Sequence, residues 1–284
     1  MNTSSIKIKD LSFSYRDKVI FEQANFTLQS NHIYGLIGPN GVGKTTLISI
    51  LAGIQKKYKG LIENIDRPGL LLQGTGFYEN LTVAENLNAS KFDKKCTSIE
   101  VDQVLSLVKM TEYRTVKFSN LSQGYKQRLG IARSLLTDGN LVLLDEPFTA
   151  VDVQTVRLLK KAIVDYVANT KKIVVISSHQ LKTIDDLIDQ PLMIKSQQVQ
   201  SFDLNKKRQK SHIIYLWLND ENSMQEVENN SAYVEQFNRV DDIVEITLSD
   251  NVKLKDFIEY LDQKQISWRR LDKEMPLEFF YFKE

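Results

Sequence analysis

The sequence lacks the features of secreted and membrane-spanning proteins. It has one cysteine, Cys96, so no internal disulfide can form, and this fits a reducing compartment. Its longest apolar runs, such as residues 213–218, are far shorter than the ~20 residues that a transmembrane helix needs. The N-terminus lacks the basic and then apolar pattern of a signal peptide. We therefore expect a soluble cytoplasmic polypeptide.

The sequence also lacks an excess of charge of either sign. Its 37 Lys and Arg residues nearly balance 36 Asp and Glu residues, and the net charge is +1. Nucleic-acid-binding domains usually carry a strong basic excess, so no nucleic-acid partner is expected. The 284 residues include 42% hydrophobic residues and show no internal repeat, which suggests one large globular domain or two unequal ones.

Two kinds of strand are expected in the N-terminal part of the chain. Residues 6–15 and 21–30 alternate polar and apolar side chains, as half-buried antiparallel strands do. Three other stretches are short and continuously apolar, namely residues 32–38, 140–147 and 171–179. Such stretches are typical of strands buried on both faces of a parallel sheet.

Helices are expected between these strands. Residues 44–54 follow the first buried strand, and residues 156–168 join the last two buried strands into a βαβ unit. Between residues 77 and 136, apolar side chains recur three and four positions apart, which predicts a helical segment.

The pattern changes near Asp203. Residues 205–210 are polar and basic, which indicates a linker between domains 1–204 and 205–284. The second domain is expected to contain a strand, a helix, two strands, a helix and a strand, at residues 212–218, 222–229, 233–237, 243–248, 254–261 and 266–271. This order is that of a small ferredoxin-like α+β unit.

Residues 38–45, GPNGVGKT, match the phosphate-loop pattern G-x-x-x-x-G-K-[ST] and follow an expected strand, as that motif requires. Its glycines let successive backbone amides point into one concavity around a phosphate. Lys44 supplies a cation for the β- and γ-phosphate oxygens, and the Thr45 hydroxyl is a suitable ligand for Mg²⁺. We expect a nucleoside triphosphate to bind to Gly38, Pro39, Asn40, Gly41, Gly43, Lys44, Thr45 and Thr46.

Two carboxylates, Asp145 and Glu146, end the apolar stretch LVLLDE. Ligands of α/β proteins bind at the carboxyl ends of the strands. Asp145 is expected to hold Mg²⁺, directly or through water, and Glu146 to orient or deprotonate the attacking water. A carboxylate pair at a strand end can instead cap a helix, but Pro147 fixes a turn here and favours the catalytic interpretation.

Three side chains have both a functional and a structural interpretation. His179 ends the next strand and is either a structural histidine or a donor to the γ-phosphate. Gln73 is either a ligand of Mg²⁺ or water, or an ordinary surface glutamine. Tyr15 either stacks on a nucleotide base or packs under the sheet. The residue pattern alone leaves these alternatives open.

The stretch LSQGYKQRLG, residues 121–130, predicts a second anion site. Ser122 can cap the backbone amides of a helix, and Gly124 lets the chain approach another group closely. Helix N-termini attract anions. The phosphate loop already provides a phosphate site, so the sequence raises the question of which phosphate this second site serves.

Together these motifs resemble those of the ATP-binding subunits of ABC transporters. GPNGVGKTT, LLLQ, LSQGYKQRL, LVLLDEP, TAVD and SSH occur in the family's order and with approximately its spacing, between residues 6 and 203. The resemblance implies a P-loop ATPase core of the α/β class, with a parallel sheet, an antiparallel β subdomain and a helical subdomain. The C-terminal α+β domain would regulate the subunit or help it to dimerise.

The resemblance also implies roles for single residues. Tyr15 would stack on adenine, and Gln73 would join Mg²⁺ to the membrane subunits. Glu146 would be the catalytic carboxylate and His179 the switch histidine. Asp152 would lie in the loop that crosses a dimer interface.

In this family the signature sequence LSGGQ contacts the γ-phosphate of ATP held by the other subunit. Here the signature stretch, residues 121–125, reads LSQGY and departs from that pattern at its third and fifth positions. By the resemblance, Ser122, Gln123 and Gly124 would contact the γ-phosphate of ATP bound to a second copy of the chain.

The resemblance implies ATP and Mg²⁺ as cofactors, a homodimer or a heterodimer with a paralogous ATPase, and separately encoded transmembrane permease subunits. The chain would lie at the inner face of the membrane. YENLTVAENL (residues 78–87) and MPLEFFYF (residues 275–282) resemble the bacterial branch that exports drugs, bacteriocins, peptides or polysaccharides. An importer ATPase is the alternative, and a soluble ATPase of DNA repair or translation is a third hypothesis.

Overall fold

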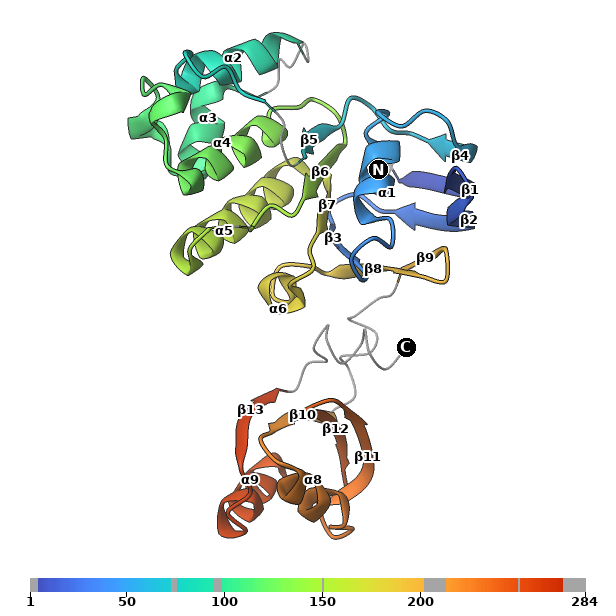
Figure 1. Cartoon of the computed structure of the whole chain (residues 1–284). Helices are drawn as coiled ribbons and strands as arrows, with labels where there is room; N and C mark the ends of the chain where they lie inside the picture. Colours follow the sequence, from blue (N-terminus) through green and yellow to red (C-terminus); the bar gives the residue numbers. More distant parts are fainter. Residues whose placement is uncertain are drawn as a thin grey trace. The chain divides into compact units, whose positions relative to one another are not determined.

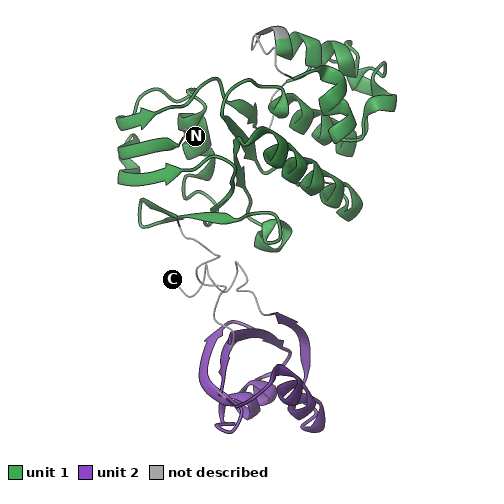
Figure 2. Ribbon diagram, turned by 180° about the vertical axis from the view of Figure 1, so that it is seen from behind, with its two compact units in different colours: residues 1–202 green, residues 203–284 purple. Residues whose placement is uncertain are grey.

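The computed structural model describes residues 5–72, 76–93, 99–149, 151–201, 213–249 and 251–272. The chain forms two compact units, residues 1–202 and residues 203–284, which Figure 2 shows in different colours. The predicted linker, residues 205–210, lies outside the described residues.

The first unit contains a six-stranded sheet in the order β5-β6-β7-β3-β8-β9. The strands are β5 (Gly69–Leu71), β6 (Leu141–Asp145), β7 (Ile173–Ser177), β3 (Ile33–Ile37), β8 (Gln190–Lys195) and β9 (Gln198–Ser201). Neighbours from β5 to β8 pair in parallel, and β9 is antiparallel to β8. Every residue of β3, β6 and β7 is buried, which confirms the parallel sheet predicted from these apolar stretches.

A three-stranded antiparallel sheet packs beside it, in the order β2-β1-β4. Its strands are β1 (Ile6–Tyr15), β2 (Lys18–Leu28) and β4 (Lys59–Glu63), and their apolar side chains share one core with α1 (Lys44–Leu51). β2 begins at Lys18, before the predicted residue 21, because Arg16 adopts a left-handed conformation (φ 48°) and the tight turn pairs Lys18 with Tyr15.

α1 lies between the two sheets, whereas the other helices of the first unit gather on the other side of the parallel sheet, away from the antiparallel strands (Figure 1). They are α2 (Val83–Asp93), α3 (Val101–Leu107), α4 (Gln123–Leu135) and α5 (Val153–Thr170), with the short α6 (Leu181–Ile184) and 3₁₀ turns at Thr111–Tyr113 and Phe118–Asn120. α5 begins at Val153 and not at the predicted residue 156, because the Asp152 carboxylate caps its first turn.

The second unit is a four-stranded antiparallel sheet in the order β11-β12-β10-β13 with two helices. Its elements are β10 (Ile213–Leu218), α8 (Glu221–Glu228), β11 (Val234–Val240), β12 (Ile243–Leu248), α9 (Leu254–Gln263) and β13 (Trp268–Asp272). Alternate residues of β10 and β12 pack against both helices in a core that includes Leu216, Ile246 and Phe257. This topology confirms the predicted ferredoxin-like α+β unit.

None of the helices within the described ranges combines the length and the apolar character that a membrane span requires.

Candidate functional site

The phosphate loop, residues 38–45, joins the end of β3 to the start of α1. Gly43 has φ 120° and precedes the first residue of α1, and no side chain caps this helix. A Cβ atom at Gly43 would lie 2.5 Å from Ile20 Cγ2 and 3.0 Å from Phe21 Cζ, so only glycine fits. Gly41, at φ 75°, has the same backbone requirement. The loop therefore keeps its backbone close to the first turn of α1, where the amides can bind an anion.

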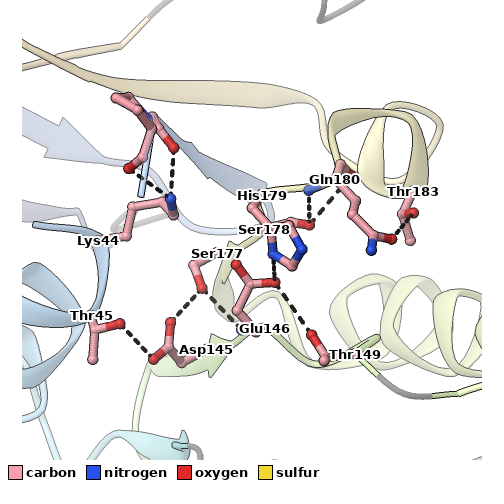
Figure 3. Close-up of polar contacts among 12 residues, drawn as sticks. Lys44, Thr45, Asp145, Glu146, Thr149, Ser177, Ser178, His179, Gln180 and Thr183 are labelled. Atoms are coloured by element: carbon pink, nitrogen blue, oxygen red, sulfur yellow. Dashed lines mark hydrogen bonds and ion pairs between the residues drawn. The ribbon is translucent and has the colours of Figure 1, made fainter. Parts of the chain in front are cut away.

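Lys44 extends into the loop that it follows. Its Nζ donates to the carbonyl oxygen of Gly38 at 2.6 Å and to that of Pro39 at 3.2 Å. Both bonds of Lys44 are drawn as dashed lines in Figure 3. The residue is 8% exposed. This burial lowers the pKa of Lys44, while the nearby carboxylates of Glu146 and Asp145 act in the opposite direction. A buried ammonium whose partners are neutral carbonyls is suited to bind a phosphate.

Asp145 connects the phosphate loop to the centre of the sheet. The Thr45 hydroxyl donates to Asp145 Oδ2 at 2.9 Å, and the Ser177 hydroxyl donates to Oδ1 at 2.5 Å. Thr45 therefore places a hydroxyl oxygen beside a carboxylate oxygen, and such hard oxygen ligands suit Mg²⁺. The described residues contain no cluster of three or more His, Cys, Asp or Glu side chains that could hold a metal ion. The Thr45–Asp145 pair thus fits a Mg²⁺ ion whose other ligands are phosphate oxygens and water.

Glu146 and His179 are in contact at the carboxyl ends of β6 and β7. Glu146 Oε2 lies 2.9 Å from His179 Nδ1, and the side chains are 14% and 43% exposed, respectively. The Glu146 amide donates to Ser177 Oγ at 3.0 Å, and the Thr149 hydroxyl lies 3.5 Å from the Glu146 carboxylate (Figure 3). The carboxylate is therefore held at the cleft beside a group that can carry a proton.

One cleft of about 420 Å³ is lined by Lys44, Thr45, Asp145, Glu146 and His179. Tyr15 lines it and is 54% exposed, with its ring edge-on to Phe13 at a centroid distance of 4.7 Å. The predicted residues that line the cleft are Tyr15, Asn40, Gly41, Gly43, Lys44, Thr45, Thr46, Asp145, Glu146 and His179. Lys18, Ile20 and Thr149 also line it and were not predicted from the sequence. Gln73 lies outside the described residues.

Ser177 was not predicted from the sequence. It is fully buried at the end of β7, where the parallel register pairs it with Asp145. Its hydroxyl donates to the Asp145 carboxylate and accepts from the Glu146 amide. The first serine of SSH was the available signal, because a polar residue at the end of an apolar strand requires a polar partner.

The signature stretch and Asp152 are not among the residues that line this cleft. Ser122 occupies the N-cap position of α4, but its side chain makes no capping hydrogen bond. A Cβ atom at Gly124 would meet no described atom within 4 Å. The first turn of α4 is thus open to a group from outside this unit.

Asp152 acts as the cap of α5. Its carboxylate accepts from the Thr155 amide at 2.9 Å and from the Thr155 hydroxyl at 2.7 Å, and these bonds lower the pKa of Asp152. Arg128 of α4 donates from Nη2 to the same hydroxyl at 2.9 Å. This chain of bonds connects the helix that follows the signature stretch to the start of α5.

Comparison with known proteins agrees with the resemblance that the motifs predicted. Residues 21–149 match the family model for the ABC transporter family. The chain is 33% identical to an uncharacterized ABC transporter ATP-binding protein of Methanocaldococcus jannaschii, over 67% of this chain and 74% of the relative. It is 32% identical to the bacitracin transport ATP-binding protein of Bacillus licheniformis, over 76% of both chains. A zinc import ATP-binding protein of Ehrlichia ruminantium is 30% identical over 64% of this chain and 76% of the relative.

The fold agrees with these relatives. A solved structure of the ATP-binding subunit of an ABC transporter superposes with a TM-score of 0.63, at 22% identity, over 72% of this chain and 92% of that chain. A chain from an ABC transporter in an inward-facing conformation superposes with a TM-score of 0.61, at 21% identity, over 87% of this chain and 98% of that chain. The chain belongs to the ATP-binding subunits of ABC transporters, a family of ATP hydrolases.

Proposed function

We propose that this ATP-binding subunit hydrolyses MgATP in the cleft described above, as one half of a dimer, and drives export through separately encoded transmembrane subunits. The convergence of Lys44, the Thr45–Asp145 pair and the Glu146–His179 pair on one cleft supports this proposal most directly. These residues match the three tasks of phosphoryl transfer, which are holding the phosphates, holding Mg²⁺ and activating water.

In this proposal the loop amides and Lys44 bind the β- and γ-phosphates. Lys44 Nζ exchanges the carbonyls of Gly38 and Pro39 for phosphate oxygens, which are stronger acceptors. Thr45 and Asp145 would hold Mg²⁺, which when bound neutralises charge on the phosphate oxygens. The exposed ring of Tyr15 would stack on the adenine.

Glu146 is proposed to act as the general base. Its carboxylate takes the proton of the attacking water, the oxygen of that water bonds to the γ-phosphorus, and the bond from the γ-phosphorus to the bridging oxygen of ADP breaks. His179 holds the carboxylate through the contact from Nδ1 and would donate to the γ-phosphate from its other nitrogen. Gln73 is proposed to contact Mg²⁺ or the attacking water and to link this contact to the membrane subunits.

The proposed dimer explains the position of the signature stretch. Ser122, Gln123 and Gly124 lie at the uncapped start of α4, which is a site for an anion, yet they do not line the cleft of their own chain. In a head-to-tail pair, each chain would present this site to the γ-phosphate held by its partner. Every group required is present in this chain, so a homodimer suffices, and a heterodimer with a paralogous ATPase is the alternative.

Export is proposed as the direction of transport. The bacitracin transport relative matches over 76% of both chains, and the C-terminal phrase MPLEFFYF resembles the exporter branch. Import is the second candidate, because relatives named for zinc import and for taurine import also match this chain.

The proposal is tested by purifying the chain with its membrane subunits from native membranes and reconstituting the complex in vesicles with the ATP-binding subunits outside. An exporter should then move its substrate into the lumen when MgATP is added outside. The control is Glu146→Gln, which should bind ATP but slow hydrolysis by about 10²- to 10⁴-fold, because it removes the base. ATP-driven loss of substrate from the lumen would indicate import, and a near-normal rate of hydrolysis in Glu146→Gln would contradict the role of Glu146.

A further inference from the structure

The turn that carries Glu146 has a strained backbone. Glu146 follows the last residue of β6 and adopts φ 50°, in the left-handed region that residues other than glycine rarely occupy. Such a conformation persists only where surrounding contacts hold it. The orientation of the Glu146 carboxylate therefore depends on whatever fixes this turn.

Two side chains bind the backbone on either side of the Glu146 side chain. On one side, Ser177 Oγ accepts from the Glu146 amide at 3.0 Å. On the other side, Gln127 Nε2 donates to the carbonyl oxygen of Pro147 at 2.6 Å. Ser177 is part of the central sheet, whereas Gln127 reaches the turn from α4. The two bonds tie the turn to two different elements.

The helix that carries Gln127 is itself firmly held. Leu129, Ile131 and Ala132 are fully buried. The Tyr125 and Tyr113 hydroxyls lie 2.6 Å apart, and their rings are tilted by 33° with a centroid distance of 4.0 Å. Gln127 lies about one turn after the start of α4, so its amide is fixed relative to the signature stretch.

We propose that Gln127 is a positioning residue for ATP hydrolysis, which holds the Glu146 turn in its active geometry from the helix that begins at the signature stretch. The inference rests on the proposed role of Glu146 as general base. Gln127 does not line the cleft, so it acts through the Pro147 carbonyl and not on the nucleotide. In the proposed dimer, the same bond joins the contact with the partner's ATP to this chain's own carboxylate.

The test begins with Gln127→Met in the full-length chain, which keeps the length of the side chain and removes the amide donor. We expect kcat for ATP hydrolysis to fall by about 10- to 100-fold, the scale of a misplaced catalytic group, with the Kd for ATP unchanged. Gln200→Met is the matched control, because it makes the same side-chain change at an exposed position of β9 that lies outside the cleft and outside the signature stretch. The control should hydrolyse ATP at the normal rate. A normal kcat in Gln127→Met would overturn the proposal.

A double-mutant cycle separates positioning from a general loss of structure. In the Glu146→Gln background there is no base left to position, so adding Gln127→Met should leave the residual rate unchanged. An equal fold-reduction in both backgrounds would overturn the proposal and indicate that Gln127 serves the fold alone. If Gln127→Met does not fold, Gln127→Glu takes its place, since it keeps the shape of the side chain without the donor. A normal rate for Glu146→Gln alone would instead refute the proposed function.

Discussion

Lys44 is a buried cation whose position suits it to bind phosphate. Its ammonium lies inside the phosphate loop and bonds to two neutral carbonyls, and burial lowers its pKa. A buried cation with neutral partners is costly, and a bound triphosphate would supply the opposite charge that offsets this cost. The carboxylates of Glu146 and Asp145 partly oppose this lowering of the Lys44 pKa.

Lys44→Ala should weaken ATP binding by about 10- to 100-fold, because the loop loses its side-chain cation and the charge-assisted hydrogen bonds to phosphate. Isothermal titration calorimetry with ATP measures the effect. Lys57→Ala is the matched control, since it removes an equal charge from an exposed position that does not line the cleft. Equal affinities for Lys44→Ala and the unmodified chain would contradict the assignment of the phosphate site.

Sequence motifs locate residues that act through local spacing, and they miss residues that act through strand register or helix placement. Lys44 and Thr45 follow glycines in a fixed pattern, so their place beside the loop could be predicted. Ser177 meets Asp145 only because β6 and β7 pair in parallel with these two residues opposite each other. Gln127 meets Pro147 only because α4 packs near the end of β6. The serine at the end of the apolar stretch indicates that Ser177 needs a polar partner but not which one, and the order of residues gives no signal for the contact of Gln127.

At the scale of elements, the buried strands were easier to predict than the boundaries of the helices. The continuous apolar runs of β3, β6 and β7 require burial on both faces, whatever surrounds them. The start of α5 depends instead on a cap. Because the Asp152 carboxylate caps the first turn, the helix begins at Val153, three residues before the predicted start. The same carboxylate that the family resemblance places at a dimer interface therefore also has a structural role within this chain.

The first turn of α4 offers a test at this scale, because there is open space beside Gly124. A Cβ atom at Gly124 would meet no described atom within 4 Å, and alanine favours a helix more than glycine does. Gly124→Ala should therefore keep or raise the melting temperature. If the partner's γ-phosphate approaches this turn, the added methyl group should still reduce ATP hydrolysis and ATP-induced dimer formation, measured by phosphate release and by gel filtration.

Gly69→Ala provides the contrast, in the strand that packs against α4. A Cβ atom at Gly69 would overlap the backbone carbonyl oxygen of Ser134 in α4, so this variant should lower the melting temperature. A Gly124→Ala variant with normal hydrolysis would show that nothing approaches the first turn of α4.

At the scale of the whole molecule, the proposed active unit is a pair of chains. One chain forms a cleft for the phosphates of one nucleotide and exposes, at a different place, a helix start suited to another anion. The pair of copies would contain two complete sites, each built from the phosphate loop of one copy and the signature stretch of the other. The C-terminal unit has its own core of apolar side chains and is proposed to modulate this pairing.

Disulfide trapping tests the central claim most directly. Cys96→Ser removes the single cysteine, and Asn40→Cys with Gln123→Cys then places one thiol in the phosphate loop and one in the signature stretch. A disulfide requires Cα atoms within about 7 Å, which is expected only across the closed, ATP-loaded pair. With Glu146→Gln to block hydrolysis, oxidation in MgATP should yield a covalent dimer on a non-reducing gel, and oxidation without nucleotide should yield little. A bond within one chain, or equal dimer yield with and without ATP, would contradict the account.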